Sequence, residues 1–264
     1  MTVLERIIEK KVVRLRQAKG LVPLSDLKAR VRDQEETRDF RTAITRGPGD
    51  IRLIAEVKRA SPSKGLIRIG FDLDAIADVY REKPVSAVSV LTEEDFFMGQ
   101  LSYLPQVRER TSKPVLRKDF IFDEYQLYEA RAWGADALLL IGSALDRGQA
   151  RDLLGLSGEL HMAVLFEIHD ERDLESALEI GADPIGINNR NLDTLGIDLS
   201  TTPRLKAQIP PGTVVVSESG IRERKDVHLL AQSGVDALLV GTSLMASDDV
   251  GRKIDELLGV LPAR

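Results

Sequence analysis

Apolar residues follow two different periods along this chain, and the change comes near residue 50. Before it they recur every three or four positions, at Leu4, Ile7, Ile8, Val12 and Leu15. This spacing predicts an amphipathic helix, and a second helix is expected to begin near Ser25, just after Pro23. The run Gly47-Pro48-Gly49 then ends the helical pattern.

After residue 50, short aliphatic runs alternate with amphipathic helical stretches. Eight such runs cover residues 51–58, 85–91, 114–118, 136–141, 162–167, 184–188, 213–218 and 236–240. Alternation of this kind predicts βαβ units and a parallel sheet. A weak internal repeat supports it, because a glycine that can end a helix precedes a strand in Gly134-Ala135-Asp136, Gly181-Ala182-Asp183 and Gly234-Val235-Asp236.

Eight units favour an α/β fold made of a single (β/α)8 TIM barrel, whose typical length is about 250 residues. We expect residues 49–264 to form this barrel and residues 1–48 to be an extra helical N-terminal segment of the same structural domain. A doubly wound sheet is the alternative. It would normally carry a G-x-G-x-x-G fingerprint after its first strand, and residues 58–65 lack one.

Composition narrows the possible functions. The chain has 264 residues, 43% of them hydrophobic, which can bury one large core, although the length alone also permits two smaller domains. With 37 basic and 42 acidic residues the net charge is −5, so we expect no nucleic-acid partner. The absence of cysteine excludes disulfides and thiolate chemistry, and the three histidines show no metal-ligand spacing.

Charges interrupt the N-terminal residues from Glu5 onward, too early for the apolar core of a secretory signal. No stretch of the sequence is apolar for long enough to span a membrane. We therefore expect a cytoplasmic protein that does not contact membranes.

Polar residues gather at the ends of the predicted strands. Strand residues alternate between two faces, so Glu56 and Lys58 share one face at the end of the first run. The ends of later runs add Lys118, Glu167, Asn188, Arg190, Glu218 and Ser219. Because the carboxyl ends of barrel strands carry the active sites of TIM-barrel enzymes, this clustering predicts an enzyme.

Several of these residues also have a structural explanation. Lys118 could pair with the adjacent Asp119, but a lysine in a barrel mouth can act as a proton donor whose pKa burial lowers. Glu167 could form a salt bridge with a neighbouring lysine, but a carboxylate that ends an apolar strand is a good general acid or base. His169, a lone histidine beyond the fifth run, is expected to be solvated and is left out of the site.

The last two loops suggest a phosphate site. Turn chemistry is the structural alternative for Asn188 and Arg190, and a strand stop is the alternative for Glu218-Ser219-Gly220. Loops after the seventh and eighth strands of barrels often bind phosphate, and Gly220 and Gly241-Thr242 fall in those loops. Their backbone amides can approach an anion without obstruction from side chains.

Five motifs, in order along nearly the whole chain, resemble the indole-3-glycerol phosphate synthase family. They are Glu56-Val57-Lys58-Arg59-Ala60-Ser61-Pro62-Ser63, Leu91-Thr92-Glu93, Leu116-Arg117-Lys118-Asp119-Phe120, Gly186-Ile187-Asn188-Asn189-Arg190 and Ser217-Glu218-Ser219-Gly220-Ile221. Two departures are minor: Met98 stands where a polar residue is more usual, and Thr242 where many relatives have serine.

The resemblance implies a (β/α)8 barrel with a helical N-terminal segment that acts in tryptophan biosynthesis. The family converts 1-(2-carboxyphenylamino)-1-deoxy-D-ribulose 5-phosphate into indole-3-glycerol phosphate, CO2 and water. It uses no cofactor and no metal, so none is expected here. The partner expected is a small anionic substrate with a phosphate and a carboxylate, and the chain is expected to be a monomer.

The resemblance also implies roles for individual residues. Lys118 is similar to the general acid that protonates the ribulose carbonyl oxygen during ring closure, and Glu167 to the group that assists the final dehydration. Glu56 and Lys58 resemble a charged pair beside the reacting centre, and all four are the implied catalytic residues. The substrate-binding residues implied are Ser61, Phe97, Phe120, Asn188, Arg190, Glu218 and Ser219, and the phosphate-binding residues are Lys58, Gly220, Gly241 and Thr242.

Two other functions stay open at this point. Phosphoribosylanthranilate isomerase, another phosphate-binding barrel, resembles this fold but uses a cysteine and an aspartate, and this chain has no cysteine. A non-catalytic barrel that binds phosphometabolites is the second alternative. The four implied catalytic residues argue against it.

Overall fold

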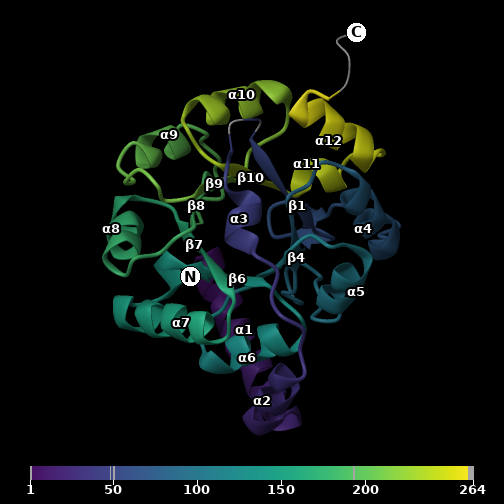
Figure 1. Cartoon of the computed structure of the whole chain (residues 1–264). Helices are drawn as coiled ribbons and strands as arrows, with labels where there is room; N and C mark the ends of the chain where they lie inside the picture. Colours follow the sequence, from purple (N-terminus) through teal and green to yellow (C-terminus); the bar gives the residue numbers. More distant parts are fainter. Residues whose placement is uncertain (1, 48, 50, 193, 261–264) are drawn as a thin grey trace.

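The computed structural model describes residues 2–47, 49, 51–192 and 194–260 of the chain. Eight parallel strands close into a barrel in the order β1-β10-β9-β8-β7-β6-β5-β4 (Figure 1). Their bounds are Arg52–Val57 (β1), Ala87–Leu91 (β4), Val115–Lys118 (β5), Ala137–Ile141 (β6), Ala163–Ile168 (β7), Ile185–Asn188 (β8), Val215–Glu218 (β9) and Ala237–Val240 (β10). Each strand overlaps one predicted run, which confirms the barrel and excludes the doubly wound sheet.

Helices surround the barrel, one after each strand. They are α4 (Leu73–Glu82), α5 (Tyr103–Arg110), α6 (Glu124–Ala132), α7 (Arg147–Glu159), α8 (Glu171–Glu179), α9 (Thr201–Lys206), α10 (Arg224–Gln232) and α12 (Val250–Leu258). Aspartates cap five of them by accepting an N–H of the first turn, namely Asp72, Asp123, Asp146, Asp170 and Asp249. No helix in the described part of the chain combines the length and apolar character needed to cross a bilayer.

Short elements decorate the carboxyl ends of the strands. A two-stranded hairpin, β2 (Ala60–Ser61) and β3 (Gly65–Leu66), follows β1. The 3-10 helix η1 (Gly142–Ala144) follows β6, and α11 (Thr242–Met245) follows β10. These additions lie in the loops where a barrel enzyme builds its site.

Alternate strand positions pack into two apolar layers. In β1, Leu53, Ala55 and Val57 belong to the layer between the strands and the outer helices, whereas Ile54 belongs to the core inside the barrel. Glu56 lies two residues beyond Ile54 and so shares its inward face. Strand alternation therefore carries the charged residues near the ends of β1, β5, β7 and β9 into the barrel mouth.

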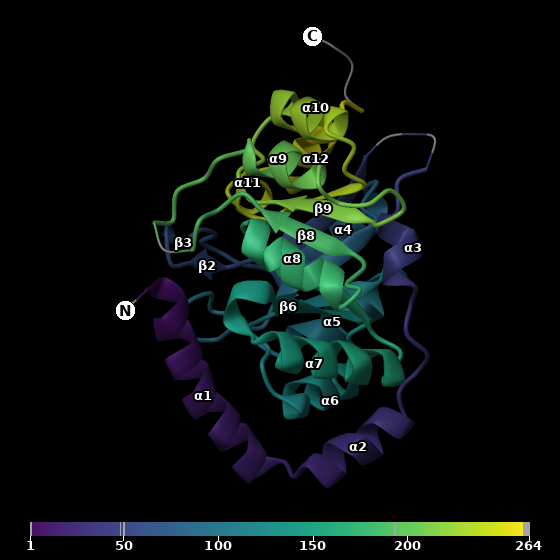
Figure 2. The ribbon, with the colours of Figure 1, turned by 90° about the vertical axis from the view of Figure 1, so that its left-hand side faces the viewer.

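The N-terminal segment wraps round the barrel and reaches both of its ends (Figure 2). α1 (Val3–Leu21) and α2 (Leu24–Arg32) match the two predicted helices. A third helix, α3 (Phe40–Ile44), was not predicted; its terminal residues are buried in the interior core, so it closes the amino-terminal end of the barrel. The predicted segment boundary at residue 48 lies outside the described residues and stays a prediction.

The three Gly-x-Asp turns fasten this segment to the base of the barrel. One carboxylate oxygen of Asp136, Asp183 and Asp236 accepts the backbone N–H of Val115, Val214 and Val215 respectively, at 2.8 to 3.0 Å. The other oxygen reaches the N-terminal segment: it accepts the backbone N–H of Arg38 or Arg46, or the guanidinium of Arg41. The internal repeat in the sequence is thus a repeated clamp.

Replacing Asp136 with asparagine should destabilise the protein by about 3 kcal/mol. Asp136 is 1% exposed, and its carboxylate also pairs with Arg108. Both oxygens accept backbone N–H groups, so an asparagine NH2 group in place of one oxygen would face an N–H donor without an acceptor. Equilibrium unfolding in urea measures the change. Asp78→Asn is the matched control, since its pairs with Arg81 and Arg110 join side chains that are at least 35% exposed and should contribute less than about 1 kcal/mol. Equal losses in the two variants would contradict the clamp.

Candidate functional site

A cavity of about 560 Å³ opens at the carboxyl ends of the barrel strands. Every residue predicted for the site lines it, namely Glu56, Lys58, Ser61, Phe97, Lys118, Phe120, Glu167, Asn188, Arg190, Glu218, Ser219, Gly220, Gly241 and Thr242. The structure also adds a wall that was not predicted, because Val3, Leu4 and Ile7 of α1 line the same cavity. Proximity brings these residues together, while their individual roles stay predictions.

Lys118 lies at the centre of the charged groups in this cavity. Its Nζ atom is 2.9 Å from Glu167 Oε2 and 3.2 Å from Glu218 Oε2. The structural alternative, a pair between Lys118 and Asp119, is wrong. Neighbouring strand residues face opposite ways, and Asp119 pairs instead with Lys11 and Arg117.

The surrounding carboxylates reverse the expected effect of burial on Lys118. Burial alone would lower the pKa of its ammonium group, as the sequence analysis expected. Glu167, Glu218 and Glu56 outweigh burial and hold this pKa well above its ordinary value. The predicted direction is therefore wrong, and Lys118 keeps its proton until a strong base, such as an alkoxide, forms beside it.

Glu167 is held by partners on both carboxylate oxygens. Oε2 faces Lys118, while Oε1 accepts a hydrogen bond of 3.1 Å from Asn188 Nδ2 and lies 3.2 Å from His169 Nε2. Burial acts to raise the pKa of Glu167, but Lys118 and His169 hold it well below its usual range. Glu167 is therefore ionised at neutral pH.

His169 was expected to be solvated, and this expectation is wrong. Its side chain is only 12% exposed and lies between Glu167 and Asp173. Burial alone would lower the pKa of His169, but the two carboxylates raise it to about 9. The sequence held the signal, because Glu167 and His169 are two residues apart, as are Glu56 and Lys58.

Glu218 is the least compensated carboxylate of the three around Lys118. Only its Oε2 atom faces Lys118, and no described residue hydrogen-bonds its Oε1 atom. Burial raises the pKa of Glu218 against the opposing effect of Lys118, and Glu167 adds to the rise, which takes it to about 7. Gly186 gives this carboxylate room, since a Cβ there would lie 2.3 Å from Oε1.

Glu56 and Lys58 form the pair that strand alternation predicted. Lys58 Nζ lies 2.6 Å from Glu56 Oε1, and Ser89 Oγ donates a hydrogen bond of 3.3 Å to Oε2. A Cβ on Gly241 would lie 2.3 Å from Glu56 Oε1. Gly241 is thus needed for space beside the pair, whatever its amide binds.

Phe97 and Phe120 form an aromatic wall in the cavity, with ring centroids 6.1 Å apart. Lys58 Nζ lies 5.9 Å from the centroid of the Phe97 ring. The loop that carries Phe97 is ordered by Glu93, which accepts the backbone N–H groups of Phe96 and Phe97 at 2.8 and 3.0 Å. Met98 has a φ of +55°, is 40% exposed and does not line the cavity.

The opposite wall presents backbone and cations suited to an anion. Ser219 and Gly220 have φ values of +67° and +87°, and Asn189 Nδ2 holds this turn by donating to the carbonyls of Glu218 and Ser219. Burial and then the nearby Arg222 guanidinium lower the pKa of Arg190. Two cations side by side favour a negative ligand between them.

Three basic residues that line the cavity, Lys64, Arg222 and Lys253, were missed by the sequence analysis. The sequence alone favours an ordinary solvated loop charge for Lys64, but Lys64 lines the cavity together with Ser61. Arg222 also lines it and was not considered. Its position two residues after Gly220, in the loop already predicted to bind phosphate, was the available signal.

Comparison with known proteins identifies close relatives. Residues 4–257 match the family model described as indole-3-glycerol phosphate synthase. The chain is 48% identical over 259 residues to a protein of that name from Dehalococcoides mccartyi (strain CBDB1), covering 97% of this chain and all of the relative. It is 46% identical over 250 residues to one from Chlorobaculum tepidum, covering 95% of this chain and 98% of the relative.

Solved structures of low sequence identity share the fold alone. A 3-hexulose-6-phosphate synthase matches with a TM-score of 0.64 at 14% identity, over 80% of this chain and all of that one. A thiamine phosphate pyrophosphorylase from Pyrococcus furiosus matches with a TM-score of 0.60 at 16% identity, over 80% and 95%.

The buried Glu218 should make stability fall as pH rises. Its folded-state pKa of about 7 exceeds the ordinary 4.5, so the folded protein binds the proton more tightly. The favourable contribution is complete below about 4.5 and is lost as pH rises through about 7. Urea unfolding at several pH values between 4 and 8 should show that the free energy of unfolding of Glu218→Gln rises relative to that of the wild type as pH rises. A difference that stays constant across this window would contradict the assignment.

Proposed function

The chain belongs to the indole-3-glycerol phosphate synthase family, and from this premise we propose that Lys118 is the general acid of its reaction. The reaction is that of a carboxy-lyase, EC 4.1.1.48, in tryptophan biosynthesis. It converts 1-(2-carboxyphenylamino)-1-deoxy-D-ribulose 5-phosphate into indole-3-glycerol phosphate, CO2 and water. The main support for this assignment is the position of Lys118 Nζ, which lies inside the cavity between the buried carboxylates of Glu167 and Glu218.

Ring closure needs a proton at the carbonyl oxygen. The aromatic carbon that bears the carboxylate attacks the ribulose carbonyl carbon, and the carbonyl electron pair moves to oxygen. Lys118 delivers its Nζ proton to that oxygen. Its raised pKa keeps the group protonated at neutral pH, so the proton is present when the alkoxide, a much stronger base than the surrounding carboxylates, forms. Loss of CO2 then returns an electron pair to the ring and restores its aromaticity.

Dehydration needs a base and an acid in the same cavity. The new hydroxyl group accepts a proton and leaves as water. The adjacent carbon of the new ring loses a proton, and a double bond forms between the two carbons. The ionised Glu167 carboxylate, steadied by Asn188, assists this step as the proton acceptor. Lys58, paired with Glu56, supplies a proton in this assignment and attracts an anionic group of the substrate, which its position in the cavity supports.

The two ends of the substrate fit the two walls. The phosphate is assigned to the loops of Ser219 with Gly220 and Gly241 with Thr242, together with Arg222 and Lys58. The carboxyphenyl ring is assigned to the aromatic wall of Phe97 and Phe120. Ser61, Asn188, Arg190 and Glu218 complete the contacts between these walls.

The state of the protein in the cell follows the same premise. A small phosphorylated substrate needs no protein partner, and one chain supplies every residue proposed for catalysis and binding. We therefore propose that the protein is a monomer and acts in the cytoplasm. Gel filtration tests the first part.

Lys118→Met should lower the rate of indole-3-glycerol phosphate formation by a factor of about 10² to 10⁴, because it removes the proton donor but keeps the length of the side chain. The appearance of indole fluorescence from the substrate measures the rate, and far-UV circular dichroism checks the fold.

Lys113→Met is the matched control, since Lys113 precedes β5 and its Nζ donates to the Lys83 carbonyl outside the cavity. It should keep most of the wild-type rate. Activity of Lys118→Met equal to that of this control would overturn the general-acid role. Turnover of phosphoribosylanthranilate in place of the indole precursor would overturn the proposed reaction.

A further inference from the structure

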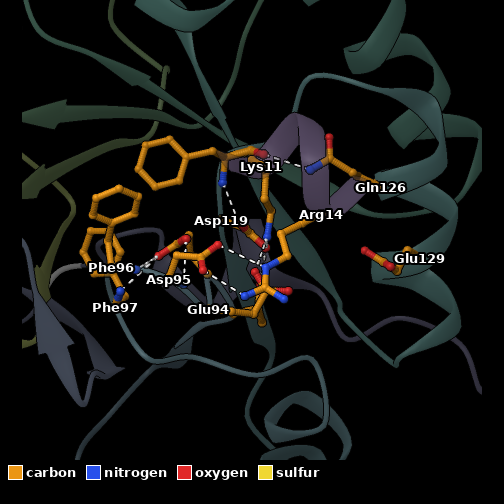
Figure 3. Close-up of polar contacts among 12 residues, drawn as sticks. Lys11, Arg14, Glu94, Asp95, Phe96, Phe97, Asp119, Gln126 and Glu129 are labelled. Carbon is orange, nitrogen blue, oxygen red and sulfur yellow. Dashed lines mark hydrogen bonds and ion pairs between the residues drawn. The ribbon is translucent and has the colours of Figure 1, made fainter. Parts of the chain in front are cut away.

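Lys11 of α1 is a buried lysine outside the site described so far. It is 5% exposed, although most charged residues of α1 face solvent. Its Nζ atom lies 2.9 Å from Asp119 Oδ2 and 3.0 Å from Glu94 Oε2 (Figure 3). Burial of an ammonium group is unfavourable unless it is paired, so this position calls for an explanation.

The two partners of Lys11 belong to the two loops that carry the aromatic wall. Asp119 directly precedes Phe120, and its Oδ1 atom accepts the Phe120 backbone N–H at 2.8 Å. Glu94 lies three residues before Phe97, in the loop whose N–H groups Glu93 holds. One ammonium group thus joins the bases of both loops.

Charge compensation of Asp119 alone does not account for Lys11. Asp119 Oδ2 already accepts hydrogen bonds from Thr92 Oγ1 at 2.6 Å and from Arg117 at 3.0 Å. Thr92 thereby already joins the start of the Phe97 loop to Asp119. What Lys11 adds is a second connection, from Asp119 to Glu94, closer to Phe97. The neighbouring pair of Arg14 with Asp95 makes no comparable connection, since Arg14 is 47% exposed and reaches only one loop residue.

Lys11 also fixes α1 over the cavity. Leu4, Ile7 and Lys11 are spaced by three and four residues and so lie on one helix face. Leu4 and Ile7 line the cavity, and Lys11 is the buried charged anchor of the same face. Lys11 therefore contacts both aromatic loops and belongs to the helix that covers the apolar end of the cavity.

We propose that Lys11 is a positioning residue that sets the spacing of the aromatic wall for the carboxyphenyl ring of the substrate. The inference rests on the proposed function for the identity of that ring. Lys11 touches no reacting atom in this assignment. It acts through Asp119 and Glu94 on the two loops that carry Phe120 and Phe97.

Lys11→Met should weaken the aromatic end of the site selectively. We expect KM for the substrate and the inhibition constant of anthranilate to rise about threefold to tenfold, the range that a lost aromatic contact gives. The inhibition constant of inorganic phosphate should change much less, because the phosphate loops lie on the opposite wall and Lys58, although near the Phe97 ring, is held by Glu56 on β1. Lys11→Arg keeps the charge and should restore anthranilate binding to within about twofold of the wild type.

Two further variants keep the test informative. Arg14→Met, on the same helix, is the matched control and should change neither constant. Glu94→Gln removes one half of the connection at a carboxylate whose side chain is 35% exposed, so the fold is not at risk, and it should weaken anthranilate but not phosphate. It stands in for Lys11→Met if that variant does not fold.

The outcomes separate the inference from the function it rests on. Equal losses for anthranilate and phosphate, or no change for either, in both Lys11→Met and Glu94→Gln would overturn the positioning role while the wild-type enzyme remains active. A wild-type protein that binds both ligands but forms no indole product would overturn the proposed function instead.

Discussion

The ammonium group of Lys118 can remain buried in the barrel mouth only because carboxylates surround it. Much of the site serves this one arrangement. Gly186 and Gly241 leave the space that the carboxylates of Glu218 and Glu56 occupy, while Asn188 and His169 hold the far oxygen of Glu167. The result is a site that carries a firmly held proton, an ionised base and one carboxylate that titrates near neutrality, and these are the components that a reaction of successive proton transfers needs.

The fold and the composition of the cavity could be predicted because strand alternation and the barrel both follow simple periods. Eight aliphatic runs gave the strands, and the polar residues at their ends all reached one cavity. The pKa direction of Lys118 could not be predicted, since it depends on carboxylates from three other strands whose distances only the closed barrel sets. His169 could have been predicted from its spacing to Glu167 on the same strand face, but its second partner, Asp173 on the following helix, could not. The short helix α3 carries too few residues to show a period.

The N-terminal segment joins the two ends of the barrel, which have different tasks. At the base, the segment is held by Asp136, Asp183 and Asp236, which accept hydrogen bonds from its backbone and guanidinium groups. Its helix α3 packs into the interior core of the barrel. At the mouth, α1 contributes apolar residues and the buried Lys11 to the cavity. The same segment therefore supports stability at one end and the geometry of the site at the other, in line with the division of labour between the two faces of TIM barrels.

The clamp between residue 46 and Asp236 has a consequence for synthesis of the chain. The N–H of Arg46 and its acceptor are 190 residues apart, and β1 needs β10 to complete its pairing. While the ribosome is still making the second half of the chain, α3 lacks its full set of partners and one edge of β1 stays open. Such an edge is a site for association with other chains, so the nascent protein depends on rapid closure once the last strand emerges.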